Sequence, residues 1–288
     1  MLGVIGGSRA YDLLCGLGVE RGALRPVPTP FGPSSPLAAG RLGSTELVVV
    51  SRHGAAGYEL AAASVNYRAN LYALRDRGVR LVVAWSGPGA VDPSLQVGQY
   101  VVPDDLLDET QGRAGTFFAG TGLGLLRQSP VFCPALAATL GRALGAAGAP
   151  ARLGGTYVCT QGPRLETPAE VRRFAGWGAH LVGMTLCPEV FLARELEMCY
   201  AALCYVTNYA EGVVPHRPPR PERLFGGLAT EKELAAQEAA ARRLPEIVER
   251  LLAELPVEPQ VCTCGQAMHR YREQGLIGED WREWVTSE

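Results

Sequence analysis

The sequence contains no apolar run that approaches the roughly 20 residues needed to cross a bilayer as a helix. Its first residues, MLGVIGG, carry neither the basic region nor the small-residue cleavage site of a secretory signal. From these two absences we expect a soluble, cytoplasmic protein that has no membrane partner.

A strong net charge of either sign is also missing. The 27 Lys and Arg residues nearly balance the 29 Asp and Glu residues, which leaves a formal net charge of −2 at pH 7. Such a chain has no electrostatic reason to bind nucleic acid or an anionic membrane. The glycine turn Gly6-Gly7-Ser8 does not fit G-x-G-x-x-G, and no acidic residue follows a second strand at the dinucleotide spacing, so we discount NAD.

The eight cysteines do not form the framework of a secreted, disulfide-rich domain. Cys159, Cys199 and Cys204 lie within apolar runs, where a thiol behaves as a small hydrophobe. Cys262 and Cys264 form one C-x-C near a single histidine, which is weak support for zinc because a structural site requires four ligands. A redox pair or a strained local disulfide is an alternative, but we favour two free thiols and expect no metal.

Strand signals alternate with helix signals along the 288 residues, of which 47% are hydrophobic, and this favours one α/β domain. Segment 104–109 is expected to be an acidic loop, and segment 117–134 an irregular apolar lid or oligomer contact. The expected strands are 2–5, 47–51, 81–85, 99–103, 156–160, 181–184 and 200–206. The expected helices are 65–77, 133–148, 167–176, 188–198 and 230–255. We expect the last helix to be broken or kinked near Pro245.

The stretch from Gly154 to Glu189 is the most informative part of the chain. It predicts strand, loop, helix, strand, loop and helix in succession, with polar residues left at the two strand ends. Ligands of parallel α/β sheets lie at the carboxyl ends of the strands. Glu166, Met184 and Thr185 are therefore candidate site residues.

Other strand ends carry groups that suit an oxyanion. Arg52 and His53 follow the second strand, and a guanidinium is a planar fork of several donors. Hydroxyl groups of Ser8 and Ser86 follow two further strands, each beside glycines that let backbone amides approach an anion. Any one of these features is unremarkable alone, but together with Thr185 they predict a phosphate site.

Six motifs taken in order carry a specific resemblance to a known family. The motifs are Gly6-Gly7-Ser8, Arg52-His53-Gly54, Val65-Asn66-Tyr67-Arg68-Ala69-Asn70, Gly162-Pro163-Arg164-Leu165-Glu166-Thr167, Met184-Thr185 and Pro188-Glu189-Val190. With this set, the sequence closely resembles the trimeric purine nucleoside phosphorylase family, in its 5′-methylthioadenosine phosphorylase branch, over about residues 1–255.

The resemblance implies a single-domain, three-layer α/β fold with a mixed, partly barrel-like central sheet flanked by helices. Residues 1–255 would form this domain, and residues 256–288 a helical extension packed on it. It also implies a homotrimer, or a hexamer built from two trimers, with sites at subunit contacts.

The implied reaction is phosphorolysis of a purine nucleoside to free base and pentose 1-phosphate, with inorganic phosphate as co-substrate and no other cofactor. The resemblance assigns phosphate binding to Ser8, Arg52, His53, Ser86, Gly87 and Thr185, ribose binding to Met184 and Asn66, and purine binding to Glu166, Asn208, Tyr209 and Ala210.

The base pocket departs from the adenine-specific branch. Adenine-specific relatives place a serine-like residue at the position of Glu166 and an Asp-x-Asp pair at Asn208 and Ala210, so this sequence resembles 6-oxopurine enzymes instead. A carboxylate accepts from N1–H of hypoxanthine or guanine, whereas N1 of adenine is itself an acceptor. A methylthioadenosine phosphorylase and a non-catalytic nucleoside-binding protein remain alternatives, and the 5′ substituent is left open between hydroxyl and methylthio.

Overall fold

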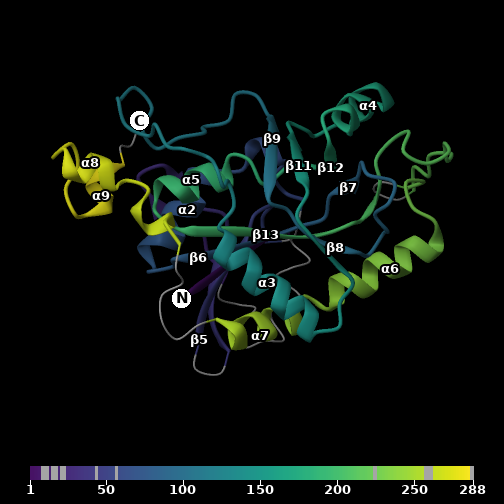
Figure 1. The fold of residues 1–288 in the computed structure, drawn as a ribbon, viewed down its shortest axis with the longest axis horizontal. Coiled ribbons are helices and arrows are strands. Elements are labelled where there is room, and N and C mark those ends of the chain that lie inside the picture. Colours follow the sequence, from purple (N-terminus) through teal and green to yellow (C-terminus); the bar gives the residue numbers. More distant parts are fainter. Residues whose placement is uncertain are drawn as a thin grey trace.

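A computed structural model describes residues 1–7, 13, 19, 24–42, 45–55, 58–222, 226–255 and 262–285. Within these residues the chain is a three-layer α/β structure, as predicted (Figure 1). Helices α3 (Pro134–Ala146), α6 (Glu231–Arg242) and α7 (Leu244–Glu254) lie on one side of the strands, and α2 (Tyr67–Asp76) and α5 (Glu189–Glu195) lie on the other.

The larger sheet has seven strands in the order β10-β8-β13-β6-β1-β5-β4. Four neighbours, β13, β6, β1 and β5, are mutually parallel, so their carboxyl ends meet at one edge. The strands are β1 (Leu2–Gly6), β4 (Leu37–Leu42), β5 (Thr45–Ser51), β6 (Leu81–Ser86), β8 (Tyr100–Val102), β10 (Ala151–Leu153) and β13 (Cys199–Tyr205).

The sheet is buried on both faces, which explains the near-continuous apolar runs of its strands. Along β1, Leu2 and Val4 join the apolar cluster beneath α3 and α7, while Ile5 joins the cluster beneath α2 and α5. Strand β5 alternates in the same way, since successive side chains of a strand point to opposite faces.

A second sheet has the order β14-β7-β12-β11-β9, so the strands divide into two mixed sheets. Helix α4 (Pro168–Gly176) packs on β12, and Thr167 and Glu170 close its capping box. The strands are β7 (Gly89–Ala90), β9 (Asp105–Glu109), β11 (Thr156–Thr160), β12 (Ala179–Gly183) and β14 (Asn208–Tyr209), and a separate hairpin pairs β2 (Pro28–Thr29) with β3 (Gly32–Pro33).

The expectation of an acidic loop at 104–109 is wrong, because Asp105–Glu109 forms the edge strand β9. It pairs in parallel with β11 along its whole length. Asp105 and Asp108 are exposed at this edge, so the acidic composition reflects a solvated strand. The break near Pro245 is confirmed, since α6 ends at Arg242 and α7 begins at Leu244.

Segment 262–285 contains the 3₁₀ turn η4 (Cys264–Gln266) and the short helices α8 (His269–Glu273) and α9 (Trp281–Trp284). Its side chains join the same apolar cluster as α2, and Arg272 forms an ion pair with Glu197 at 2.9 Å. A domain boundary at residue 256 stays a prediction, because residues 256–261 lie outside the described part of the chain.

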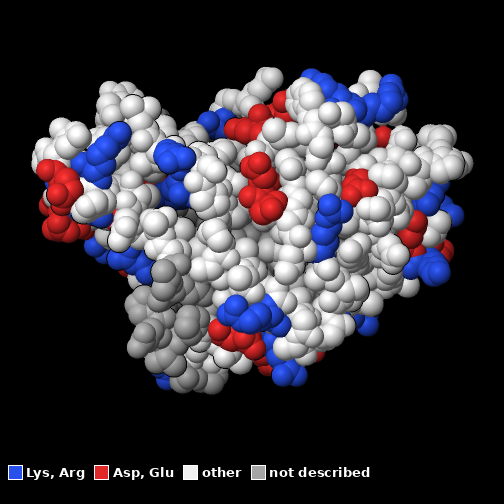
Figure 2. Space-filling view, viewed as in Figure 1, with Lys and Arg blue, Asp and Glu red and all other residues white. Residues whose placement is uncertain are grey.

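Charges of both signs are interspersed over the face shown in Figure 2, with much uncharged surface between them. This distribution accords with the balanced composition. Among the helices that the structure describes, none combines the length and apolar character needed to cross a bilayer.

Candidate active site

A cavity of about 650 Å³ opens at the carboxyl ends of β1, β5, β6 and β13, and β12 contributes to its wall. It gathers nine of the twelve predicted site residues from segments that are distant in the sequence. They are Arg52, His53, Ser86, Gly87, Glu166, Met184, Thr185, Asn208 and Ala210.

Of the other three predicted residues, Ser8 lies outside the described residues, and Asn66 and Tyr209 are not among the described residues that line the cavity. Asn66 caps α2 instead: its side-chain oxygen accepts from the amide of Ala69 at 3.1 Å, and its amide donates to the carbonyl of Phe31 at 2.7 Å. The Tyr209 hydroxyl donates to the carbonyl of Leu95 at 2.8 Å. The polar groups of Asn66 and Tyr209 thus make local hydrogen bonds, and their assignment as ligand contacts stays a prediction.

The hydroxyl groups of Ser86 and Thr185 line the cavity side by side. Ser86 Oγ lies 3.4 Å from Thr185 Oγ1 and 3.4 Å from the hydroxyl of the fully buried Tyr157. Burial raises the pKa of Tyr157 well above its usual value, so the phenol stays protonated and can donate to Ser86. Gly87 follows Ser86 where the chain passes close to Thr207, since a Cβ on Gly87 would lie 2.7 Å from its methyl carbon. The arrangement offers several neutral donors to one anion.

Arg52 adds a charged group to the cavity lining, although its side chain is only 1% exposed. Its Nε and Nη2 atoms donate to the two carboxylate oxygens of buried Glu189 at 2.9 and 2.8 Å. Burial disfavours the guanidinium charge, but Glu189 more than offsets this, and the pKa of Arg52 rises above its usual value. The Tyr200 hydroxyl also donates to Glu189, at 2.7 Å, which fixes the pair.

His53 is uncharged at neutral pH. Burial and the neighbouring Arg52 charge lower the pKa of His53 to about 4. Its Nδ1 lies 2.9 Å from the carbonyl oxygen of Leu60, so the ring hydrogen is on Nδ1 and Nε2 is an acceptor. His53 can therefore accept a hydrogen bond from a ligand but does not supply positive charge.

Glu166 and Asn208 also line the cavity. The Thr160 hydroxyl donates to Glu166 Oε1 at 2.6 Å, which orients the carboxylate. The Thr207 hydroxyl donates to Asn208 Oδ1 at 2.8 Å, and Asn208 Nδ2 donates to the carbonyl of Tyr209 at 2.9 Å, which leaves the second amide hydrogen for a ligand. Ala210, another lining residue, is small and buried.

Sequence reasoning missed Arg113, which fixes the loops on either side of the cavity. Its guanidinium donates to the main-chain carbonyls of Thr160, Gln161, Met184 and Cys187 at 2.6 to 3.0 Å, and to the Gln161 side chain at 3.1 Å. No motif marks this residue, because its partners are backbone groups. It holds the loop after β11 against the loop after β12.

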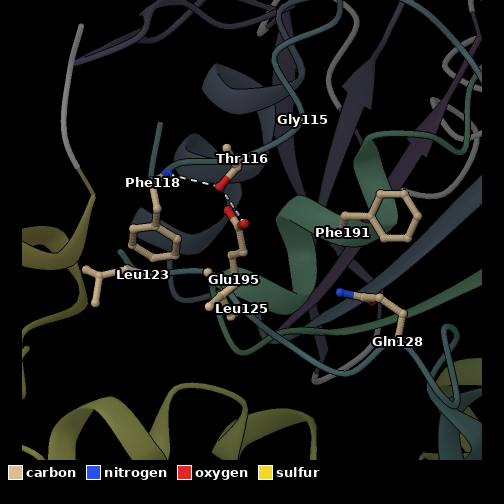
Figure 3. Close-up of a pocket in the computed structure, with 9 residues that line it drawn as sticks. Gly115, Thr116, Phe118, Leu123, Leu125, Gln128, Phe191 and Glu195 are labelled. Carbon is tan, nitrogen blue, oxygen red and sulfur yellow. Dashed lines mark hydrogen bonds between the residues drawn. The ribbon is translucent and has the colours of Figure 1, made fainter. Parts of the chain in front are cut away.

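A second hollow, of about 380 Å³, lies beside α5 within the irregular segment (Figure 3). Glu195 anchors this segment: its carboxylate accepts from Thr116 Oγ1 at 2.6 Å and from the amide of Phe117 at 2.7 Å. Burial raises the pKa of Glu195 to about 7. Among the described residues, this hollow and the cavity above share no lining residue, so the two are separate.

Comparison with known proteins agrees with this geometry. Residues 2–253 match the family model of the phosphorylase superfamily. A 6-oxopurine nucleoside phosphorylase of Pyrococcus furiosus is 35% identical over 271 residues, which cover 92% of this chain and 95% of the relative. An S-methyl-5′-thioadenosine phosphorylase of Mycolicibacterium smegmatis is 46% identical over 215 residues, which cover 74% and 78%.

Among solved structures, the methylthioadenosine phosphorylase of Schistosoma mansoni in complex with adenine is similar, with a TM-score of 0.80 and 27% identity. The match covers 94% of this chain and 97% of that one. The chain shares the length and the fold of these relatives, and the family's motifs line its cavity. It therefore belongs to the phosphorylase superfamily, in the family of purine nucleoside and methylthioadenosine phosphorylases.

Proposed function

We propose that this protein cleaves 6-oxopurine nucleosides with inorganic phosphate, giving the free base and a pentose 1-phosphate. The observation that carries the proposal is that Glu166 and Asn208 line the same cavity as Arg52, Ser86 and Thr185. The first two residues suit the edge of a 6-oxopurine, and the other three suit a phosphate.

In this reaction a phosphate oxygen forms a bond to C1′ while the bond from C1′ to N9 breaks, and the purine leaves with the electron pair. Positive charge develops on the ribose and negative charge on the base. Donors from Arg52, Ser86, Thr185 and the backbone at Gly87 hold the phosphate dianion against C1′, with Met184 beside the ribose. The hydrogen of a bound hydrogen phosphate can be donated to His53 Nε2. The reaction requires no metal and no cofactor other than phosphate.

Base choice follows from the donor and acceptor pattern. The oriented carboxylate of Glu166 accepts from N1–H of hypoxanthine or guanine, and the Asn208 amide donates to O6 or N7 as the base leaves. Adenine presents an acceptor at N1, so its binding would set two acceptors against each other. A site built on such hydrogen bonds discriminates by up to ~10⁴-fold, because a mismatched base leaves buried polar groups unpaired.

Three apolar residues on the segment around α6 suit an apolar 5′ group. Leu228, Ala229 and Leu234 line the same cavity, together with the polar Gln237 and Glu238, and residues 226–242 contain no histidine. Because apolar side chains gain free energy by covering apolar surface, a methylthio group suits them better than a hydroxyl. We therefore include 5′-methylthioinosine among the substrates. A relative from Methanothermobacter thermautotrophicus, 35% identical over 269 residues, is named a probable S-methyl-5′-thioinosine phosphorylase.

We also propose a homotrimer, or a hexamer made of two trimers, and a cytoplasmic location, both from the family resemblance. The irregular segment that Glu195 anchors is the proposed subunit contact. Sedimentation and mass photometry of the purified protein measure the assembly directly.

A phosphate-dependent assay tests the proposed function. Inosine, guanosine, adenosine and their 5′-methylthio analogues are compared by kcat/KM, with a phosphate-free control. We expect 6-oxopurine nucleosides to be preferred by about 10³-fold or more. Asn208→Asp should reduce the ratio, and Glu166→Ser with Asn208→Asp and Ala210→Asp should shift it toward adenine nucleosides.

Methylthioadenosine phosphorolysis is the second candidate, favoured by the 46% identical mycobacterial relative. A wild-type protein that cleaves methylthioadenosine best would refute the 6-oxopurine assignment and leave the phosphorylase chemistry intact. Nucleoside binding without phosphate-dependent cleavage of any of the six substrates would refute both candidates.

A further inference from the structure

Four cysteines from three distant segments meet at one edge of the fold, away from the cavity residues. Cys133 is the N-cap of α3, Cys199 begins β13, and Cys262 and Cys264 lie at the entrance to η4. Their four Sγ atoms all lie within 4.8 Å of one another. Cys199 and Cys262 are separated by 3.4 Å between sulfurs and by 63 residues in the sequence.

These distances fit four ligands around one ion. Sulfur atoms bonded in a disulfide are about 2.05 Å apart, well below the 3.4 Å observed. Four sulfurs placed tetrahedrally at about 2.3 Å from a zinc ion are about 3.8 Å from each other. That value lies between the 3.4 Å that separates Cys199 from Cys262 and the 4.8 Å within which all four sulfurs lie.

The backbone holds the sulfurs in place. The amide of Cys133 donates to the carbonyl of Tyr200 at 2.8 Å, and the amide of Cys199 donates to the carbonyl of Arg80 at 2.8 Å. Cys133 also sits at the positive end of the α3 dipole, which favours a thiolate. Cys133, Cys199 and Cys264 are buried and Cys262 is partly exposed, which gives an ion a route from solvent.

We propose that Cys133, Cys199, Cys262 and Cys264 form a tetrahedral Zn²⁺ site that fixes the C-terminal segment to the phosphorylase domain. Four thiolates fill the coordination sphere, so the site is structural and has no open position for catalysis. Binding replaces the four thiol protons by one Zn²⁺ and releases them to solvent, with no change of oxidation state. This site differs from the predicted pair of free thiols because two of its ligands come from far earlier in the sequence.

Zinc content of the full-length protein tests the proposal. The protein is prepared without chelator, and zinc, free thiols and intact mass are measured under non-reducing conditions. We expect about one zinc per chain, with four thiols that react only after the ion is removed. Cys133→Ser and Cys199→Ser should retain less than about a tenth of the zinc. Cys204→Ser, a buried cysteine on the same strand β13, is the matched control and should keep it.

Cobalt substitution of the wild type keeps the test informative if the cysteine variants fail to fold. Co²⁺ in four thiolates gives the intense visible absorption of a tetrahedral site, and added Zn²⁺ should abolish it. Three results would overturn the proposal. The first is a metal-free protein whose intact mass is four hydrogens below that of the fully reduced chain, which indicates two disulfides. The second is four reactive thiols and no bound metal after zinc is supplied, and the third is bound iron in place of zinc.

Discussion

The buried pair of Arg52 and Glu189 gives the sharpest prediction about phosphate. Both side chains are almost wholly excluded from solvent, and two hydrogen bonds of 2.9 and 2.8 Å join them. Arg52→Met should therefore have two separable effects. It removes a positive charge from the proposed phosphate end of the cavity, and it leaves the Glu189 carboxylate buried without its partner.

The two effects have different magnitudes and different remedies. An unpaired buried charge costs about 3–5 kcal/mol in the free energy of unfolding, whereas replacing both members of such a pair is often close to neutral. Arg52→Met with Glu189→Gln should therefore recover most of the lost stability, because the new amide oxygen can still accept from the Tyr200 hydroxyl. Loss of the phosphate contact should persist in the double variant, with kcat/KM for phosphate about 10²- to 10³-fold below the wild type.

Urea unfolding and initial-rate kinetics at varied phosphate separate these outcomes. The single Glu189→Gln variant is the control, because it keeps the guanidinium while weakening its anchor. Wild-type phosphate kinetics in the folded double variant would show that Arg52 is structural only. An Arg52→Met variant destabilised by less than about 1 kcal/mol would refute the argument from the buried pair.

Three further predictions concern other residues. Arg113→Met leaves several main-chain carbonyls without a donor, so the nucleoside KM should rise about tenfold or more and the free energy of unfolding in urea should fall by about 3 kcal/mol. Arg113→Lys should recover only part of the KM and of the stability, and an unchanged KM in Arg113→Met would contradict the proposed positioning role. For Glu195, burial raises the pKa from 4.5 in the unfolded chain to about 7 in the folded protein, which favours the protonated carboxyl. This contribution to the free energy of unfolding is fully present below pH 4.5 and is lost as the pH rises through 7. Glu195→Gln should remove on the order of 3 kcal/mol of this pH dependence, measured by urea unfolding from pH 4.5 to 8 against exposed Glu249→Gln; parallel curves would contradict the assignment. Gly87→Ala places a Cβ 2.7 Å from the methyl group of Thr207, so kcat/KM for inosine should fall about tenfold, and wild-type kinetics would show that the loop accommodates the atom.

The parallel strands were predictable because burial on both faces leaves a continuous apolar run. Residues 81–85 are such a run, and the strand expected there is β6, which continues to Ser86. Strand β9 was missed because its sequence DLLDE carries acidic side chains that are solvated at a sheet edge. Strand β4 lies at the edge of the larger sheet and is also weak as a sequence signal, since only Leu37 and Ala38 of its six residues are buried.

The cavity was predictable where a residue directly follows a strand that ends at it. Ser86 and Thr185 are placed by the sheets in this way, and their positions follow from the strand pattern. Asn66 could not be assigned by the same reasoning, because an asparagine before a helix is equally suited to cap it. The positioning role of Arg113 could not be predicted, because its partners lie in remote segments. The meeting of Cys133 with Cys262 could not be predicted for the same reason, since local sequence patterns do not encode such contacts.

The proposed base contacts and the proposed phosphate contacts are supplied by different pieces of chain. Glu166 comes from the loop after β11 and Asn208 from β14, whereas Arg52 follows β5 and Ser86 ends β6. Under the proposed assignment, segments 160–167 and 207–211 determine which purine base is preferred. The segments that contact phosphate do not affect this preference. Grafting both segments from a relative of opposite preference would therefore transfer the choice of purine while the chemistry of bond cleavage stays with the recipient scaffold.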